Sequence, residues 1–278
     1  MDTIIGLGSA GCNIAMKFSL YPQYKTICID TEDKGYENYV AINRQSTHED
    51  YEQHYTSLDL SGVSGHAALI VGGSGFISGA SLRILEQLQD HKISIVYIRP
   101  DLDIITEKGR MRERIVFQVM QQYARSNKFE RIYLIDNLKV EEIVGAVSIK
   151  EYWNKINETI ASTLHMTNVF SHTQPEMSTF SNFPETAKIS TVGLVDINTG
   201  EEKLFFDLEC PREKLYYYAI SEKELSENAD LFRDIVKQVK SRAGTKARAS
   251  YGIYSTNYDK NYAYTAHHAS MIQGENIS

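Results

Sequence analysis

Two glycine-rich stretches carry residues of the types that bind phosphate. The first, Gly6–Gly11, reads Gly-Leu-Gly-Ser-Ala-Gly and separates an apolar run from a helical pattern. Its glycines let the backbone turn sharply, and the following helix offers unpaired N–H groups and the positive end of its dipole. The second, Gly72–Gly79, reads Gly-Gly-Ser-Gly-Phe-Ile-Ser-Gly and adds the hydroxyl groups of Ser74 and Ser78. Two such loops indicate a ligand with several phosphates, held from both sides.

The first loop alone is also the fingerprint of a dinucleotide-binding domain. Asp30 ends the second apolar run roughly 20 residues later, where an acidic residue would bind a ribose. This hypothesis, an NAD(P)-dependent oxidoreductase, leaves the second glycine loop unexplained and stays open as an alternative. The sequence lacks a Gly-x-x-x-x-Gly-Lys-Ser/Thr motif, so it is not that of a P-loop protein.

Short apolar runs alternate with helical patterns and must position these loops. The runs are rich in isoleucine, valine and leucine, as expected of strands covered on both faces. Strands are expected at Thr3–Leu7, Lys25–Asp30, Ala67–Val71, Ile93–Ile98 and Arg131–Ile135. Helices are expected at about Cys12–Leu20, Ala80–Gln89, Lys108–Ser126 and Val140–Val144, with a long one at Ile149–Met166. This alternation predicts a parallel sheet with right-handed crossovers.

The second half of the chain has a different pattern. The long helix carries an apolar stripe at spacings of three and four, made of Trp153, Ile156, Ile160 and Leu164. The polar segment Thr167–Lys188, with two prolines, is expected to connect two domains. Strands are expected at Lys188–Asp196, Glu202–Leu208, Leu215–Ile220, Ala249–Tyr254 and Tyr262–Ala269, with a helix at Ser221–Ala243 and a hairpin turn at Asn257–Lys260.

The predicted fold class is therefore α/β, with a parallel-sheet, Rossmann-like nucleotide-binding domain, a long central helix and a smaller C-terminal α+β domain. We expect these parts at residues 1–148, 149–187 and 188–278. The chain of 278 residues, 42% hydrophobic and 23% charged, has the composition of a globular protein.

Composition also excludes several functions. No run reaches the roughly 18–20 apolar residues of a membrane span. The formal charge of −7 argues against general nucleic-acid binding. The start of the chain lacks a signal-peptide pattern. Cys12, Cys28 and Cys210 are interpreted as reduced thiols in or near the core. A cytoplasmic protein is therefore expected.

The pair His267 and His268 has no third ligand at metal spacing, and no metal site is predicted. The basic run Lys237–Arg248 is interpreted mainly as a solvated helix end.

The two loops together resemble the phosphate loops of the tubulin/FtsZ superfamily, whose second loop carries a GGGTGTG signature. The likeness continues in order along about residues 1–170. Arg99-Pro100-Asp101 resembles the loop that approaches the ribose, and the helix that begins Lys108-Gly-Arg-Met-Arg is similar to the matching FtsZ helix. Asp136-Asn137 stands where tubulins carry an Asp-Asn pair that contacts guanine, and Tyr152-Trp153-Asn154 opens the long helix as an aromatic residue and asparagines do in the family. The small size suggests a divergent member, and a phage or plasmid origin is one option.

The resemblance implies that the chain binds GTP or GDP, with Mg²⁺ left open as a companion ion. Trp153 and Asn157 are four residues apart and share a helix face, so an aromatic plane and a carboxamide could meet the base together. The structural alternative, in which Trp153 packs in the core and Asn157 is solvated, stays open. The choice between guanine and adenine as the bound base also stays open. The expected nucleotide-binding residues are Gly6, Gly8, Ser9, Ala10, Gly11, Cys12, Gly72, Gly73, Ser74, Gly75, Phe76, Ile77, Pro100, Asp101, Asn137, Trp153 and Asn157.

Two parts of the family pattern differ here. A further phosphate loop is expected between the second strand and the second glycine loop, and we assign it to Asp59–Gly65. In the family, acidic residues after the central helix enter the neighbouring subunit's site and activate water there. Here Asn168–Glu176 contains a single carboxylate, so Glu176 is the candidate catalytic residue, with His172 as a second option. Losing an acidic pair should slow hydrolysis far more than binding.

The leading hypothesis is a GTP-binding, tubulin/FtsZ-like cytoskeletal protein whose partner is itself. Head-to-tail contacts are heterologous and generate open filaments. GTP hydrolysis, if the chain is an active GTPase, would occur at the subunit interface. The first alternative is a nucleotide-binding filament or scaffold protein without efficient GTPase activity.

Overall fold

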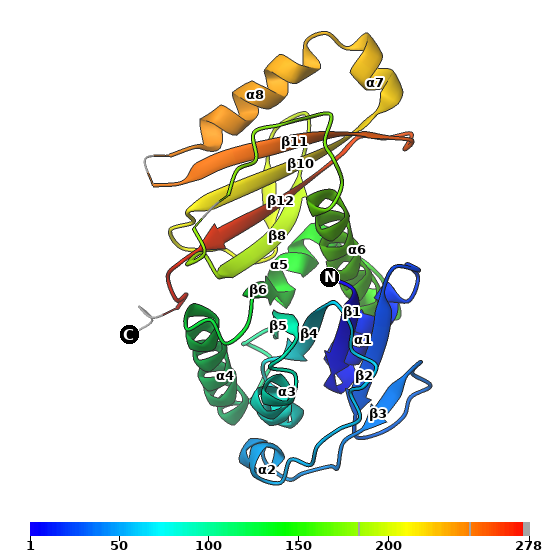
Figure 1. Cartoon of the computed structure of the whole chain (residues 1–278), viewed down its shortest axis with the longest axis vertical. Helices are drawn as coiled ribbons and strands as arrows, with labels where there is room; N and C mark the ends of the chain where they lie inside the picture. The colour runs from blue at the N-terminus through cyan, green and yellow to red at the C-terminus, as the bar shows by residue number, and fades with distance from the viewer. Residues whose placement is uncertain (183, 245, 275–278) are drawn as a thin grey trace. The chain divides into compact units, whose positions relative to one another are not determined.

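The computed structural model of the chain describes residues 1–182, 184–244 and 246–274. It divides into two compact units, Met1–Ser162 and Thr163–Ser278. Each unit contains strands with helices packed against them (Figure 1).

The first unit is built on parallel strands in the order β3-β2-β1-β4-β5-β6. Their bounds are β1 Thr3–Leu7, β2 Lys25–Asp30, β3 Tyr39–Ala41, β4 His66–Gly72, β5 Lys92–Arg99 and β6 Arg131–Asp136. All five residues of β1 and the central five of β4 are buried, which explains the continuous apolar runs in the sequence. The five predicted strands are confirmed to within one residue at each end.

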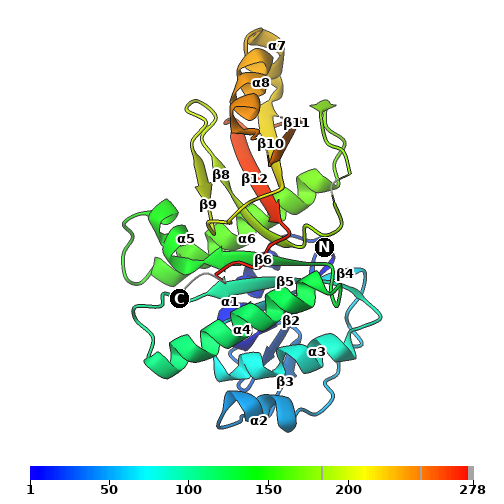
Figure 2. The same ribbon diagram turned by 90° about the vertical axis from the view of Figure 1, so that its left-hand side faces the viewer.

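Helices cover both faces of this sheet. Their bounds are α1 Gly8–Phe18, α2 His48–Gln53, the 3₁₀ helix η1 Phe76–Ala80, α3 Ser81–Gln87, α4 Glu107–Arg125, α5 Asn137–Val144 and α6 Tyr152–Ser171. Helix α1 lies on one face, and α3 and α4 lie on the other (Figures 1 and 2). Right-handed crossovers explain why these helices lie on opposite faces. The chain crosses the sheet in one direction from β1 to β2 through α1, and in the opposite direction from β4 to β6 through α3 and α4.

The strand order reverses between β1 and β4. From β1 the chain goes to β2 and β3 on one side, and it returns to β4 on the other side of β1. In the register of the sheet, Leu7 lies beside Ile29 and Val71, and Gly72 lies beside Ile98. The carboxyl ends of these strands therefore meet at one edge. In open α/β sheets, ligands bind in the crevice at such a switch point.

The second unit has mixed strands in the order β8-β12-β10-β11-β7, with β9 paired to β8. Their bounds are β7 Met177–Ser178, β8 Ile189–Val195, β9 Glu202–Leu204, β10 Glu213–Ser221, β11 Arg248–Thr256 and β12 Tyr262–Ala269. Helices α7 (Glu222–Glu227) and α8 (Leu231–Arg242) follow β10. Ile235 and Val239 of α8 pack in a core with Tyr216, Tyr218 and Ile253 of the strands.

Predictions for two parts of the second unit are wrong. The turn at 257–260 does not join a hairpin, because β10 lies between β11 and β12, parallel to the first and antiparallel to the second. The single helix expected at Ser221–Ala243 is two helices, since the Asn228 side-chain oxygen accepts from Asp230 and Leu231 and ends the first pattern. The basic run is confirmed in part as a helix end, because Lys240 and Arg242 lie in the last turn of α8 and Lys237, Lys240 and Lys246 are exposed. Two of its members form ion pairs, Arg242 with Glu202 at 3.0 Å and Arg248 with Glu213 at 2.8 Å.

Cys12 and Cys28 are buried as expected, whereas Cys210 is exposed. Cys210 also has a φ of 48°, in the left-handed region, which places it in a turn outside the core. None of the helices in the described ranges is long and apolar enough to cross a membrane. Within those same ranges, no three His, Cys, Asp or Glu side chains gather as metal ligands. His267 and His268 instead lie in the core, where His267 approaches Glu202 and His268 bonds Ser190.

Candidate functional site

A cavity of about 530 Å³ lies at the carboxyl ends of β1 and β4. Both glycine loops line it. The first contributes Gly8, Ser9 and Ala10, and the second contributes Gly72, Ser74, Gly75, Phe76 and Ile77. Eight of the residues expected to bind nucleotide are therefore brought together by the fold at its topological switch point. Where the two glycine loops line the cavity, most side chains are small or absent, which suits an anion that is bound by N–H groups.

The first loop is shaped by glycines that no other residue could replace without movement. Gly8 has a φ of +70°, and a Cβ on it would stand 2.6 Å from Cγ2 of Ile77 in the second loop. A Cβ on Gly6 would stand 2.6 Å from the backbone of Cys12. Gly6 and Gly11 thus permit helix α1 to pack closely on the strands, so that its amino end faces the cavity.

Cys12 has a packing role in the structure. Its side chain is completely buried, and the thiol donates to the carbonyl oxygens of Gly6 at 3.4 Å and Ile29 at 3.6 Å. The hydrogen bond with Cys28 raises the pKa of this thiol, and burial raises it further. The side chain is directed into the core, and Cys12 does not line the cavity.

Helix α4 supports the second loop through Arg112. Arg112 donates from Nε to the carbonyl oxygen of Ser74 at 2.8 Å, and its guanidinium lies 4.2 Å from the centre of the Phe76 ring. Gly73 packs against the hydroxyl of Tyr97 and donates its N–H to Ile98 at 3.0 Å. Ser78, which the sequence offered as a phosphate ligand, is buried and donates its hydroxyl to the carbonyl of Gly75 at 2.7 Å. Its hydroxyl therefore shapes the loop.

The last residue of β2 and residues of the segment after it complete the cavity. Asp30 and Arg44 line it, together with Thr31, Gln45 and Tyr51. Asp30 accepts from the hydroxyl of Ser9 at 3.0 Å, and Lys34 donates to the same hydroxyl at 2.6 Å. The expected segment Asp59–Gly65 does not supply this wall, and Asp59 lines a separate hollow beside β3.

Sequence reasoning missed Thr31, Arg44, Gln45 and Tyr51 because the elements around them are short. Strand β3 has three residues and α2 has six, too few to show a period. Two signals could have found them. Thr31 directly follows a strand end beside the first loop, and Thr47 caps α2 by accepting from the N–H of Asp50, a pattern visible as Thr-x-x-Asp.

Polar residues gather farther along the same sheet edge. Asp136 caps α5 by accepting from the N–H of Leu138 at 3.0 Å, and Asn137, half-buried, begins that helix. Burial raises the pKa of Asp136, and the charge of Asp101 adds to the rise. Burial, a hydrogen bond to Glu141 and the charge of Asp101 raise the pKa of Tyr152 to about 12. The charge of Asp101, which follows half-buried Pro100, thus acts on both Asp136 and Tyr152.

The start of α6 presents an aromatic face to solvent. Trp153 is 54% exposed and packs edge-on against Tyr152, with 5.0 Å between ring centres. The predicted apolar stripe is thus wrong at its first position, because only Ile156, Ile160 and Leu164 are buried. Asn157 is half-buried. The Asn154 amide oxygen accepts from Lys17 of α1, and this bond fixes the start of α6 on α1.

Glu176 lies in the second unit, immediately before the short edge strand β7. Its N–H donates to the carbonyl of Ile253 at 2.8 Å, and its carboxylate is exposed. His172 is also exposed, and its Nδ1 lies 2.8 Å from the carbonyl of Asn168 and 3.0 Å from the hydroxyl of Ser171. Glu176 is thus anchored through its backbone with its side chain free to meet a neighbouring molecule, whereas His172 is engaged by its own helix end.

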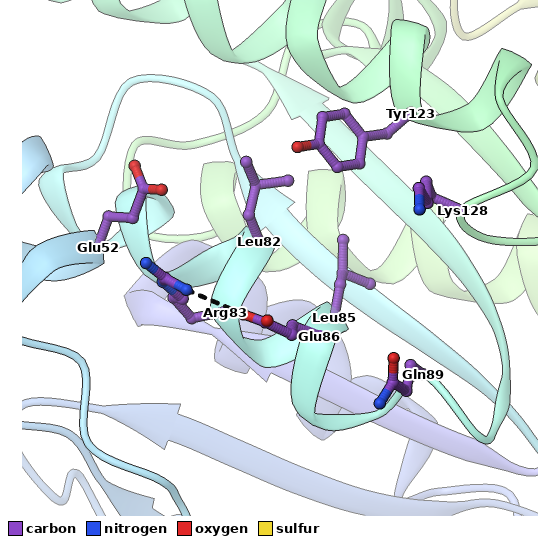
Figure 3. A pocket seen from close by; sticks show the side chains of 8 residues that line it. All are labelled: Glu52, Leu82, Arg83, Leu85, Glu86, Gln89, Tyr123 and Lys128. Atoms are coloured by element: carbon purple, nitrogen blue, oxygen red, sulfur yellow. Dashed lines mark hydrogen bonds and ion pairs between the residues drawn. The ribbon is translucent and has the colours of Figure 1, made fainter.

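A second hollow of about 400 Å³ lies between α2, α3 and α4 (Figure 3). Leu82, Leu85 and Tyr123 line it together with charged residues that include Lys128. Arg83 and Glu86 form an ion pair at its edge, at 3.0 Å. Its lining comes from helices, apart from Lys128 and Gln89 beside them, and contains no glycine loop. It therefore lacks the feature that suits the first cavity to phosphate.

Comparison by sequence finds no protein-family model and no curated protein that matches this chain. Comparison of structures finds clear similarity. A GTPγS-form protofilament of TubZ from Bacillus thuringiensis serovar israelensis aligns with a TM-score of 0.69 and 13% identity, over 96% of this chain and 86% of that one. An empty FtsZ dimer from M. jannaschii gives 0.69 and 14%, over 96% and 87%.

A third similar structure is the GTPγS-bound protofilament of CetZ2 from Haloferax volcanii, with a TM-score of 0.69 and 14% identity, over 96% of this chain and 92% of that one. At these identities the likeness establishes the fold. The chain has a divergent tubulin/FtsZ-like fold with a Rossmann-like parallel sheet, as its sequence predicted.

Proposed function

We propose that this chain binds GTP or GDP with the phosphates in the cavity between its two glycine loops. The observation that carries the proposal is the position of both loops on one cavity, at the carboxyl ends of adjacent parallel strands. A Cβ at Gly8 would clash with Ile77, so the two loops are in direct contact beside the cavity. Two of the similar structures, the TubZ and CetZ2 protofilaments, are GTPγS forms, which supports a guanine nucleotide.

The ribose and base would lie along the same edge, toward α5 and α6. Pro100 and Asp101 would approach the ribose, and Asn137 and Asn157 would bond the edge of the base. Trp153 would stack on its plane, since its ring is exposed and held edge-on by Tyr152. Mg²⁺ is usually held by one or two carboxylates together with substrate phosphates, and Asp30 is the carboxylate that lines this cavity.

The chain would assemble head to tail with copies of itself. The similar structures include protofilaments of TubZ and CetZ2. The fold that the chain shares with them is what supports the proposed assembly. In such an assembly the exposed carboxylate of Glu176 would reach the nucleotide of the next subunit and orient the attacking water. Phosphoryl transfer depends on positioning and charge stabilisation, so a single carboxylate could support hydrolysis at a reduced rate.

A second candidate function is a filament or scaffold that binds nucleotide with little turnover. One observation favours it: the segment 168–176 offers Glu176 as its single carboxylate. The dinucleotide alternative is not favoured, because a dinucleotide domain needs only the first glycine loop and the second loop lines the same cavity.

The proposal is tested by identifying the nucleotide that the protein binds. The purified protein is denatured, released nucleotide is separated by chromatography, and titration calorimetry is run with GTP, GDP, ATP and NAD⁺. We expect guanine nucleotide in the extract and saturable binding of GTP and GDP. Binding of NAD⁺ without binding of GTP would overturn the proposal, and equal affinity for ATP would remove its assignment of guanine.

A further inference from the structure

We propose that Lys34 and Arg44 are the cations that bind the nucleotide phosphates, an inference that rests on the proposed function. Arg44 lines the cavity formed by the two glycine loops. Lys34 reaches the same wall, where its ammonium group donates to the hydroxyl of Ser9 at 2.6 Å. Both lie on the segment between β2 and α2, which is separate in sequence from the two glycine motifs.

The two cations are held by acidic neighbours in ways that permit exchange. Arg44 pairs with Glu32 at 2.8 Å, and both side chains are largely exposed, at 72% and 61%. Lys34 lies 3.9 Å from Asp30 and is about half exposed. Exposed ion pairs of this kind contribute little net stability, so a ligand with greater negative charge can replace the carboxylate.

Asp30 keeps its partners if Lys34 turns toward a ligand. Its two carboxylate oxygens accept from the hydroxyl of Ser9 at 3.0 Å and from the N–H of Thr31 at 2.8 Å. Its side chain is only 7% exposed, so it stays fixed in the cavity wall. Lys34 can therefore move as a single side chain while the wall behind it remains in place.

The chemistry of the two side chains fits phosphate oxygens. The glycine loops supply partial positive charge from N–H groups, whereas a nucleoside triphosphate carries several full negative charges. A lysine ammonium acts as a point charge on a flexible stem, and an arginine guanidinium offers paired donors that match phosphate geometry. The two residues thus make affinity depend on the number of phosphates, with GTP bound more tightly than GDP and GMP bound weakly.

The test is titration calorimetry of GTP, GDP and GMP with Lys34→Gln, Arg44→Gln and the double variant. Each single substitution is expected to weaken GTP binding about tenfold, and the double variant more, with GMP affinity changed less than about threefold. Lys92→Gln and Arg83→Gln are matched controls, because they remove exposed cations paired with Glu130 at 3.8 Å and Glu86 at 3.0 Å away from the glycine loops. The controls should bind GTP as the unmodified protein does.

The possible outcomes distinguish a failure of this inference from a failure of the proposed function on which it rests. If the unmodified protein binds no guanine nucleotide, the proposed function fails. If it binds GTP and the double variant binds GTP equally well, or loses GTP and GMP by the same factor, the assignment of Lys34 and Arg44 is overturned. Thermal melting shows whether a variant is folded. The salt dependence of GTP relative to GMP binding by the unmodified protein gives a second readout, and equal dependence for both would also overturn the assignment.

Discussion

Trp153 is the single tryptophan of the chain, and its position makes the proposed base site directly observable. Its indole ring is 54% exposed, beside Tyr152 at the start of α6. An exposed large aromatic ring on an otherwise polar helix start is explained if a planar ligand covers it. Asn154, the next residue, is already bonded to Lys17, so the contact to the base falls to Trp153 and Asn157.

We expect GTP to change the tryptophan fluorescence of the protein saturably, because a stacked base would cover the indole. The measurement is emission against GTP concentration, with calorimetric affinity as the reference. Trp153→Phe keeps an aromatic plane and should bind GTP several-fold more weakly. Constant emission while calorimetry reports binding would contradict the stacking role of Trp153.

Gly6 shows how one residue controls an element. A Cβ at this position would stand 2.6 Å from the backbone of Cys12, which cannot move unless α1 moves as a whole. Gly75 is a matched control, since its φ of −71° suits any residue and its Cβ would lie 3.7 Å from the nearest side chain. Gly6→Ala should lower the free energy of unfolding by about 2 kcal/mol, whereas Gly75→Ala should change it little. Urea unfolding followed by circular dichroism measures both, and equal stability of the two variants would show that α1 does not depend on this close approach.

A buried polar cluster joins four elements of the second unit. Glu202 of β9 accepts from the Tyr216 hydroxyl at 2.7 Å, lies 3.0 Å from Arg242 of α8 and lies 3.3 Å from His267 of β12. Burial alone would raise the pKa of Glu202, but the close approach of His267, the hydrogen bond from Tyr216 and the charge of Arg242 lower it to about 2. The cluster fixes α8 over the strands.

The lowered pKa of Glu202 predicts a loss of stability in acid. Because its folded pKa of about 2 lies below the ordinary 4.5, its contribution is complete above pH 4.5 and is lost as the pH falls toward 2. The size is roughly 3 kcal/mol, from 1.36 kcal/mol for each pKa unit. Glu202→Gln should therefore be less stable at pH 7 and less dependent on pH between 4.5 and 2 in urea unfolding. Glu201→Gln, an exposed neighbour, should follow the unmodified protein, and an unchanged acid slope in Glu202→Gln would contradict the account.

At the scale of elements, the sequence predicts the first unit better than the second. The five long strands of the first unit are buried on both faces, so each is a continuous apolar run with clear ends. The order of β10, β11 and β12 depends on pairing between distant residues, which periodicity does not record. The two glycine loops are local motifs and were found from their residues. Arg44 and Lys34 approach the same cavity through a three-residue strand and a polar segment, where no local pattern indicates the fold.

For the whole molecule, the proposed filament requires each chain to carry two parts of one catalytic site. The glycine loops belong to the first unit, and Glu176 belongs to the second, where its backbone is tied to Ile253 and its carboxylate is exposed. A carboxylate that acts on a neighbour's nucleotide should affect turnover and leave the chain's own binding intact.

Glu176→Gln is expected to bind GTP and form filaments normally while phosphate release falls by at least tenfold. The reason is that the amide cannot accept the proton of the attacking water. Glu185→Gln removes another exposed carboxylate of the polar segment Thr167–Lys188 and serves as the control. Malachite-green phosphate assays and negative-stain images of the same samples measure both properties, and full turnover by Glu176→Gln would remove it from the catalytic role.

The most direct test of the central claim is phosphate release from GTP as a function of protein concentration, with light scattering recorded on the same samples. If the nucleotide is hydrolysed between subunits of a head-to-tail filament, turnover for each chain should be very low below a critical concentration and rise steeply above it, together with scattering. Turnover that is constant for each chain at all concentrations, without scattering, would contradict the account. So would the absence of both turnover and filaments at every concentration.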